Sequence, residues 1–405
     1  FSLTGCLARL LLLLPYFTAL ALALLPSGSV FLFRALFVLS IGLIAYYFRS
    51  LLFPVPRGRV RVMLYGLGLL LLFIAGDAFI RRYASEPFGQ WDAWSIWHPR
   101  IRDFSLSFLR GIEVSFFRSD WAHPDYAPMA ALGVAGPVIF LGQWALPWLP
   151  AAMNFAYYVL MLAILLLALA AVLTQEWIVP LVVFLGAMLS PMLFLNATDQ
   201  CADHYLALIF LLSFALLDEA SSRGQLILAG FCAASLPLIK NEGMFLLLAP
   251  GMYLAWLWLR QHRSLRQCLY FLSGMLAPLT MFLIYKLTAN RLQPYDTTMA
   301  RIFELLLDPA RHGAVLGRWL DAHIVLSLAF LPISWLMVRP RGRERAGLLA
   351  ILLVFTIYHL VFVVTPADQK WHLDTAFTRI TVVVYPAWGF LMLRALLPAS
   401  LQIGR

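Results

Sequence analysis

Long apolar runs separated by short polar segments dominate the chain. A helix needs about 20 apolar residues to cross a hydrocarbon core roughly 30 Å thick. Ten runs fit this length: 8–25, 29–53, 60–79, 152–173, 178–196, 204–218, 268–288, 322–338, 346–365 and 380–397. Two further apolar tracts, 128–149 and 226–259, are interrupted by Pro, Gly and the tetrapeptide KNEG. The pattern predicts an all-α fold with about 11–13 transmembrane helices.

Composition supports the same class. Hydrophobic residues make up 62% of the 405 residues and charged residues 12%, which is more apolar surface than one soluble core could hide. We therefore expect a polytopic membrane protein with a single transmembrane domain over residues 1–405. The four cysteines show no spacing typical of a zinc site or a disulfide framework.

The formal charge of +10 comes almost wholly from arginine. In a soluble domain it would suggest a nucleic-acid partner, but here the excess of basic residues in cytoplasmic loops explains it, and we expect no nucleic acid. Three short arginine-rich connections are predicted to be cytoplasmic: 57–61, 260–266 and 339–345. The loops 81–127, 289–321 and 366–379 then lie together on the outer face.

One tract cannot cross if this orientation holds. If every apolar tract between 128 and 259 spanned the membrane, the arginine-rich loop 260–267 would emerge on the outer face, against its charge. The tract 128–149 contains several Pro and Gly residues and is predicted to dip in and return. Residues 196–205 and 240–243 then share the outer face with the loop 81–127.

The loop 81–127 is the most polar and aromatic part of the chain and the candidate active-site loop. Its string WDAWSIWH, residues 91–98, predicts an amphipathic helix lying flat at the interface, with Trp91, Trp94 and Trp97 on one side. An aromatic belt is the simpler role for these tryptophans. Asp92 is flanked by indoles, loses solvation there and thereby suits a general base.

Further polar groups fall on the same predicted face. His123, Asp125 and Tyr126 close the loop where two prolines lead back into the membrane. Asp199 and Asp203 are four residues apart, on one side if helical, and could hold a divalent cation or orient a substrate. A solvated loop explains this acid pair equally well.

Two more clusters complete the set. Lys240 and Glu242 would each cost about 3 kcal/mol if they faced lipid, so they are predicted to face protein or water, or to neutralise each other. His372 lies in the last outer loop, and Arg379 could reach an anionic headgroup from the start of the final span. All clusters converge on one interface, whereas a secondary transporter usually places its polar groups near the midplane.

The strings WDAWSIWHPR, HPDYAP, KNEG and TPADQKWHLDTAFTR resemble those of the GT-C membrane glycosyltransferases. That superfamily includes protein O-mannosyltransferases and the lipid A aminoarabinose transferase. The resemblance covers most of residues 60–395 as a pattern of positions, and WDAW replaces an acidic pair that many relatives carry there.

The resemblance implies an inverting transferase in the bacterial inner membrane, with its active site facing the periplasm. The donor would be a sugar on polyprenyl phosphate, and the sugar and the acceptor stay open. Asp92 would be the base, with Asp77 and Glu86 as alternatives. Lys240, Arg379 and His372 would bind the donor phosphate.

Substrate contacts fall to six residues in this scheme: Trp91, Trp94, His123, Asp125, Tyr126 and Glu242. Asp199 and Asp203 are the candidates for a divalent metal, although several relatives act without one. A lipid or ion transporter is the competing function, and a non-catalytic membrane scaffold is a third.

Overall fold

The computed structural model describes most of the chain, in the ranges 3–48, 59–116, 121–124, 126–173, 178–188, 199–260, 262–289, 299–365 and 368–397. Within these ranges the regular secondary structure is helical throughout, which confirms the all-α prediction.

Helices of the first half are α1 (Leu3–Leu24), α2 (Val30–Phe48), α3 (Arg59–Ser85), the π-helix η2 (Ala93–Trp97), α4 (His98–Leu109), α5 (Met129–Leu141), the 3₁₀ turn η3 (Gln143–Ala145), α6 (Leu149–Val172) and α7 (Ile178–Met188). Those of the second half are α9 (Asp203–Glu219), α10 (Arg223–Ile239), α11 (Gly243–Leu246), α12 (Leu248–Leu259), α13 (Leu265–Ala289), α14 (Met299–Leu306), α15 (Pro309–Trp319), α16 (Ala322–Val338), α17 (Gly342–Val364), α18 (Gln369–Val382) and α19 (Tyr385–Ala395).

Four helical stretches in the described residues are long and apolar enough to cross a membrane: Leu149–Val172, Leu265–Thr288, Gly342–Val364 and Gln369–Ala395. Seven further apolar helices of 10–17 residues accompany them. The chain is thus a helical protein with several potential membrane spans, and the count of 11–13 stays a prediction.

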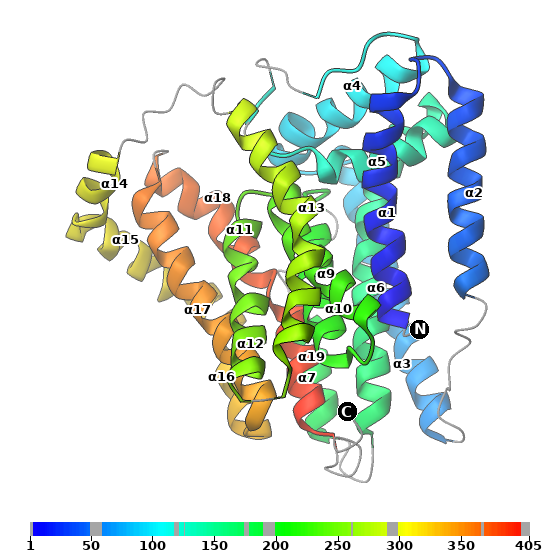
Figure 1. Ribbon diagram of the computed structural model, residues 1–405. Helices are drawn as coiled ribbons and strands as arrows, with labels where there is room; N and C mark the ends of the chain where they lie inside the picture. The colour runs from blue at the N-terminus through cyan, green and yellow to red at the C-terminus, as the bar shows by residue number, and fades with distance from the viewer. Residues whose placement is uncertain are drawn as a thin grey trace.

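The long helices run up and down along a common axis (Figure 1). The turns from α12 to α13 and from α16 to α17 lie at the lower end in Figure 1, which we call the arginine-rich end. The opposite end, where α3 ends and α18 begins, is called the site end. The arginine-rich connections 260–266 and 339–345 therefore share one end of the bundle, as their charge predicted.

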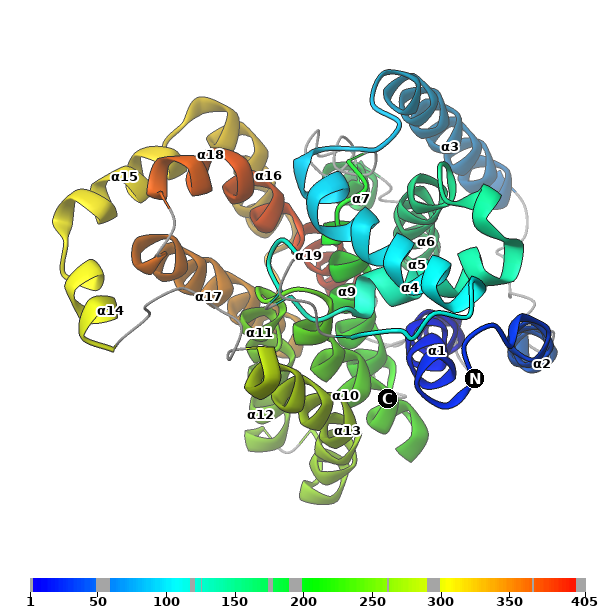
Figure 2. The ribbon, with the colours of Figure 1, turned by 90° about the horizontal axis from the view of Figure 1, so that it is seen from above.

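Two short helices, α4 and α5, pack against each other and close the site end. Seen from above, α4 runs lengthwise across the bundle while α2 is viewed end-on (Figure 2). α5 packs against α4 and α1 and does not traverse the bundle. After Gly142, with a positive φ of 106°, the chain turns back, and the Tyr83 hydroxyl at the end of α3 donates to the Pro147 carbonyl. The tract 128–149 thus returns beside the loop 81–127, and its depth in a membrane stays a prediction.

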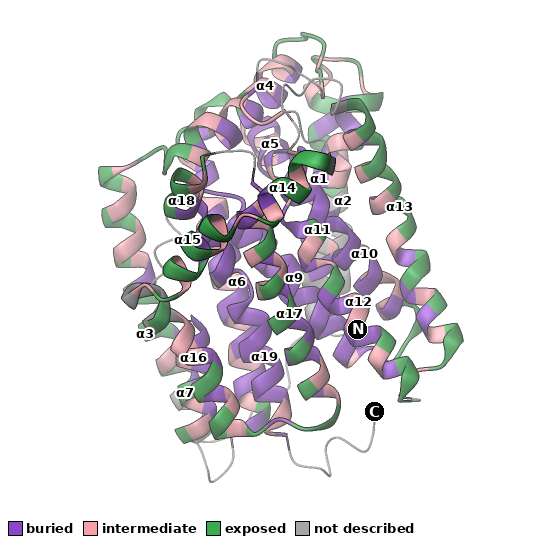
Figure 3. Cartoon of the chain, turned by 90° about the vertical axis from the view of Figure 1, so that its left-hand side faces the viewer, coloured by how far each residue is buried: buried purple, intermediate pink, exposed green. Residues whose placement is uncertain are grey.

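The core surrounds α9, in which nearly every residue is buried (Figure 3). α10, α6 and α19 pack around it. α10 also lies directly against α13, because Gly230 faces the Phe271 carbonyl and Gly274 faces the Ile227 carbonyl with no room for a side chain. This packing fixes both ends of α9, and each end carries a buried acid, Asp203 and Asp218.

Candidate functional site

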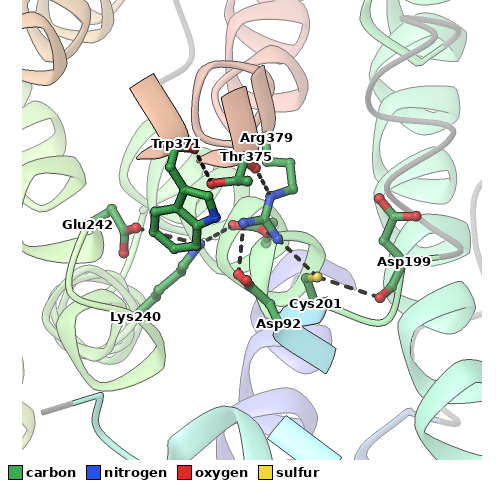
Figure 4. A network of polar contacts seen from close by, with 9 residues as sticks. Asp92, Asp199, Cys201, Lys240, Glu242, Trp371, Thr375 and Arg379 are labelled. Atoms are coloured by element: carbon green, nitrogen blue, oxygen red, sulfur yellow. Dashed lines mark hydrogen bonds and ion pairs between the residues drawn. The ribbon is translucent and has the colours of Figure 1, made fainter. Parts of the chain in front are cut away.

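Four charged side chains meet near the start of α9, from segments far apart in the sequence (Figure 4). Lys240 Nζ lies 2.9 Å from Asp203 Oδ1. Arg379 of α18 places Nη2 2.8 Å from Asp92 Oδ2 and Nη1 3.9 Å from Asp203 Oδ2. Asp203 therefore bridges the two cations, and Arg379 bridges two acids. We call this group, with Glu242, the site cluster.

The KNEG turn positions Lys240 and Glu242. α10 ends at Ile239, and Lys240 adopts an extended backbone, so its side chain leaves the helix axis. The turn closes when the Gly243 N–H donates to the Lys240 carbonyl at 2.9 Å. Gly243 is required there because a Cβ would overlap the Leu236 carbonyl. Lys240 Nζ then lies 3.5 Å from Glu242 Oε1, so the predicted pairing of these two residues is present.

The ammonium group of Lys240 stays charged although it is buried. Burial lowers its pKa, but the carboxylates of Asp203 and Glu242 raise it, and the net result is a pKa well above the usual value. Two acid oxygens nearby, Asp203 Oδ2 and Glu242 Oε2, are buried without a hydrogen bond in the part of the chain that the structure describes. Such atoms are expected to bind a ligand or water.

Aromatic rings line the cluster. The Trp91 ring contacts the rings of Trp94, Trp371 and His123 with centroids 6.1, 6.0 and 6.5 Å away. His123 stacks on Tyr126 at 5.1 Å. The indoles of Trp91 and Trp94 remain about half exposed, at 44% and 52%. They form an accessible aromatic edge beside the buried charges.

The predicted single tryptophan face is wrong. Trp97 is buried and stacks on Tyr126 at 5.9 Å, whereas Trp91 and Trp94 face outwards. The reason is local: residues 93–97 form a π-helix, whose wider turn rotates Trp97 away from the face that an α-helix would give it. π-turns of this kind often occur at functional sites.

Asp199 and Asp203 do not form the predicted helical acid pair. α9 begins at Asp203, so Asp199 precedes the helix, and its carboxylate points away from Arg379 (Figure 4). Asp199 Oδ1 lies 3.8 Å from Arg82, and its carbonyl receives the Gln90 N–H. Burial raises the pKa of Asp199 to about 7, although Arg82 and Arg379 lower it in part.

A metal does not fit these residues. Among the described residues, no group of three or more His, Cys, Asp and Glu side chains is placed to hold a metal ion. Asp203, the acid in the centre of the cluster, instead faces Lys240 and Arg379. We therefore derive no step through a metal.

The remaining predicted residues are Asp77, Glu86, His372 and Asp125. Asp77 and Glu86, the alternative bases, pair with Arg81 and Arg82 on the partly exposed surface near the end of α3, outside the site cluster. His372 lies two helical turns before Arg379, where its Nδ1 is 2.9 Å from Thr365 Oγ1. Asp125 lies outside the described residues.

Sequence reasoning missed three contributors. They are Cys201, Trp371 and Arg82. Cys201 Sγ accepts a hydrogen bond from Arg379 Nη1 at 3.2 Å, Trp371 packs on Trp91, and Arg82 faces Asp199. The sequence offered a signal for two of them. Cys201 stands two residues before Asp203, and Trp371 lies directly beside His372. Spacing rules for disulfides and metals do not detect a single thiol that accepts a hydrogen bond.

Comparison with known proteins adds no name to this site. No family model matches the chain, and neither the curated proteins nor the solved structures contain a match. The site cluster combines buried cations, which can stabilise an anion, with carboxylates that can accept a proton, beside exposed indoles.

Proposed function

We propose that this protein is an inverting glycosyltransferase of the GT-C type, which moves a sugar from polyprenyl phosphate to an acceptor hydroxyl. The observation that carries the proposal is the contact between Arg379 and Asp92, 2.8 Å apart, with Lys240 on the other side of Asp203. Such a site holds an acid and two cations within reach of one reacting bond. The arginine-rich end would face the cytoplasm of a bacterium, and the site end the periplasm.

Arg379 would change partners during the reaction. An oxygen of the donor phosphate accepts a hydrogen bond from Arg379 in place of Asp92, and Lys240 supplies a second positive charge. Asp92, released from its ion pair, takes the proton of the acceptor hydroxyl. The acceptor oxygen bonds to the anomeric carbon from the opposite face, the carbon–oxygen bond to phosphate breaks, and polyprenyl phosphate leaves with the electron pair.

The aromatic residues would hold the sugar and the lipid. The exposed faces of Trp91 and Trp94 suit stacking on a sugar ring or on prenyl carbons. His123 contacts Trp91 and stacks on Tyr126, and His372 contacts Trp371, the neighbour of Trp91. These three residues would offer hydrogen bonds to sugar hydroxyls or the phosphate. Glu242 Oε2, which accepts no hydrogen bond from the residues that the structure describes, is the candidate to receive a sugar hydroxyl.

Two measurements test the proposal. Lipid extracted from the purified protein and identified by mass spectrometry should contain a polyprenyl phosphate. The variant Asp92→Asn should then lose release of polyprenyl phosphate from the glycosylated donor, by about 100- to 10,000-fold, while donor binding survives. Transfer retained in Asp92→Asn would exclude Asp92 as the base.

A cation-coupled transporter is the second candidate, and the charge balance favours it. The site cluster contains three carboxylates, those of Asp92, Asp203 and Glu242, against the two cations Lys240 and Arg379. An excess of acid suits a proton better than a phosphate. For a transporter, Asp92→Asn changes cation flux in proteoliposomes and no sugar transfer occurs in either protein.

A further inference from the structure

A second polar region lies at the arginine-rich end, remote from the site cluster. A cavity of about 680 Å³ opens between the ends of α9, α12, α16 and α19 and the start of α17. Four arginines line it, Arg263, Arg339, Arg341 and Arg343. Its acids are Asp218 and Glu344, so basic groups outnumber acidic ones.

The acids of this cavity are already neutralised. Asp218 receives Arg394 at 2.7 Å and Arg343 at 3.5 Å, and Glu344 also accepts from Arg343 at 2.9 Å. Arg339 and Arg341 are exposed at the mouth, and neither forms an ion pair with an acid in the described part of the chain. The mouth of the cavity thus carries positive charge in excess of what its acids offset.

The backbone at the mouth adds to this charge. Arg339 and Gly342 both have positive φ, 50° and 56°, so the chain turns sharply between α16 and α17. Arg341 occupies the N-cap of α17 and makes no side-chain capping bond. The first N–H groups of α17, with the positive end of the helix dipole, are therefore directed at the same region.

An apolar groove continues from this cavity. It has a volume of about 710 Å³, lies between α12 and α17, and shares His262 and Gly342 with the basic cavity. Along its length it is lined by Met252, Trp256, Leu349 and Leu353, and Arg260 and Arg345 also border it. Leu349 and Leu353 are 50% and 42% exposed. Both helices are apolar, so the groove runs from the polar cavity along the side of the bundle that would contact lipid.

We propose that these two connected spaces bind an anionic phospholipid, with its phosphate in the arginine-lined cavity and an acyl chain in the groove between α12 and α17. Arginines bind phosphate oxygens in pairs of parallel hydrogen bonds, and basic pockets between membrane helices on the positively charged side are suited to anionic headgroups. A free phosphate would satisfy the cavity alone. The continuous groove is what selects a lipid.

Native mass spectrometry of the full chain in detergent tests this directly. Phosphatidylglycerol is titrated against phosphatidylcholine, and bound lipid is counted. The double variant Arg339→Gln/Arg341→Gln should bind phosphatidylglycerol about 30-fold more weakly. The matched control Arg223→Gln/Arg266→Gln removes the same charge from exposed arginines at the same end, outside both spaces, and should bind as the parent does.

A third variant separates the two spaces. Leu353→Trp fills the groove and should weaken phosphatidylglycerol binding, while the binding of inorganic phosphate, measured by calorimetry, stays the same. Equal losses in both double variants would show that bulk charge alone attracts the lipid and would overturn the proposal. So would phosphate binding that matches lipid binding in strength, because the groove would then have no role. Melting temperatures close to the parent's confirm that each variant is folded.

Discussion

Two buried ion clusters occupy opposite ends of the same helices. α9 carries Asp203 in its first turn and Asp218 in its last, about 22 Å apart along the axis. The C-terminal helices supply Arg379 to the first acid and Arg394 to the second. The two acids are fifteen positions apart in the sequence, and so are the two arginines. Two successive helices, α18 and α19, thus each supply one arginine to an acid of α9.

The clusters differ in how fully their polar atoms are paired. The Asp218 carboxylate receives Arg394 at 2.7 Å, Arg343 at 3.5 Å and the Tyr253 hydroxyl at 3.3 Å. Asp203 receives Lys240 at 2.9 Å on Oδ1, but its Oδ2 lies 3.9 Å from Arg379 and has no hydrogen bond in the described residues. A satisfied network rigidifies a bundle, whereas an incomplete one leaves atoms for a ligand. We therefore infer that Asp218 stabilises the bundle, whereas Asp203 belongs to a site that binds a ligand.

The largest effect is expected from the same substitution made in each cluster. Arg379→Gln should reduce release of polyprenyl phosphate from the donor by about 100- to 1000-fold, because a cation on the leaving phosphate is lost. Arg394→Gln should leave turnover per folded molecule close to the parent value. Assays on detergent-purified protein, corrected for the folded fraction, measure both. Equal losses in the two variants would remove the distinction between the clusters.

Asp218→Asn tests the other half of the comparison. It leaves Arg394 buried without its counter-charge, which should lower the free energy of unfolding by about 3–5 kcal/mol. Unfolding by denaturant in detergent, followed by tryptophan fluorescence, measures the change. A loss below about 1 kcal/mol would contradict a stabilising role, since a complete buried network cannot be broken at so small a cost.

Most of the fold could be predicted because it follows from apolar runs. The ranges 322–338 and 152–173 correspond closely to α16 and α6, since a helix of that length must be apolar to cross lipid. The break at 128–149 followed from charge and from Pro and Gly content. What failed was local geometry at the site. A π-turn at 93–97 leaves no trace in a hydrophobic pattern. The apolar run 204–218 did predict α9, which begins at Asp203, so Asp199 lies before the helix and not on one face of it with Asp203.

The sequence predicted which residues belong to the site better than it predicted how they pair. Buried charge is costly in an apolar chain, so Asp92, Lys240 and Arg379 had to find partners, and the structure places them in one cluster. Which partner each would take depends on packing between helices distant in sequence. Asp92 was expected to lose solvation between indoles, and the structure shows that it also forms an ion pair with Arg379.

Asp199 supplies a prediction on pH. Burial raises its pKa from 3.8 to about 7, so between these values the folded state holds a proton that the unfolded state has lost. Stability should therefore be highest at acidic pH and should fall as pH rises towards 7, by of the order of 4 kcal/mol in total. Asp199→Asn mimics the protonated acid and should remove this fall.

Denaturant unfolding at pH 5 and pH 7.5 covers part of this interval and should show a fall of about 2.5 kcal/mol. The matched control is Glu304→Gln, which changes an acid whose side chain is 67% exposed and should leave the pH profile as it is. A parent profile that is flat over this interval would show that Asp199 is charged in the folded protein. Asp199 would then be a buried carboxylate close to the three of the site cluster, and the acid excess there would favour a cation as the ligand.

The smallest effect is expected at Asp77, one of the two alternative bases that the family resemblance offers. Asp77 forms an ion pair with Arg81 one helical turn away, and both side chains are at least half exposed, at 50% and 80%. Asp77→Asn should change the free energy of unfolding by less than about 0.5 kcal/mol and should leave donor turnover unchanged. Unfolding and turnover measured beside Asp92→Asn give the contrast between an exposed pair and a buried one. If Asp77→Asn abolished turnover while Asp92→Asn did not, the base would lie on α3, and the site cluster would have to be a structural network like that around Asp218.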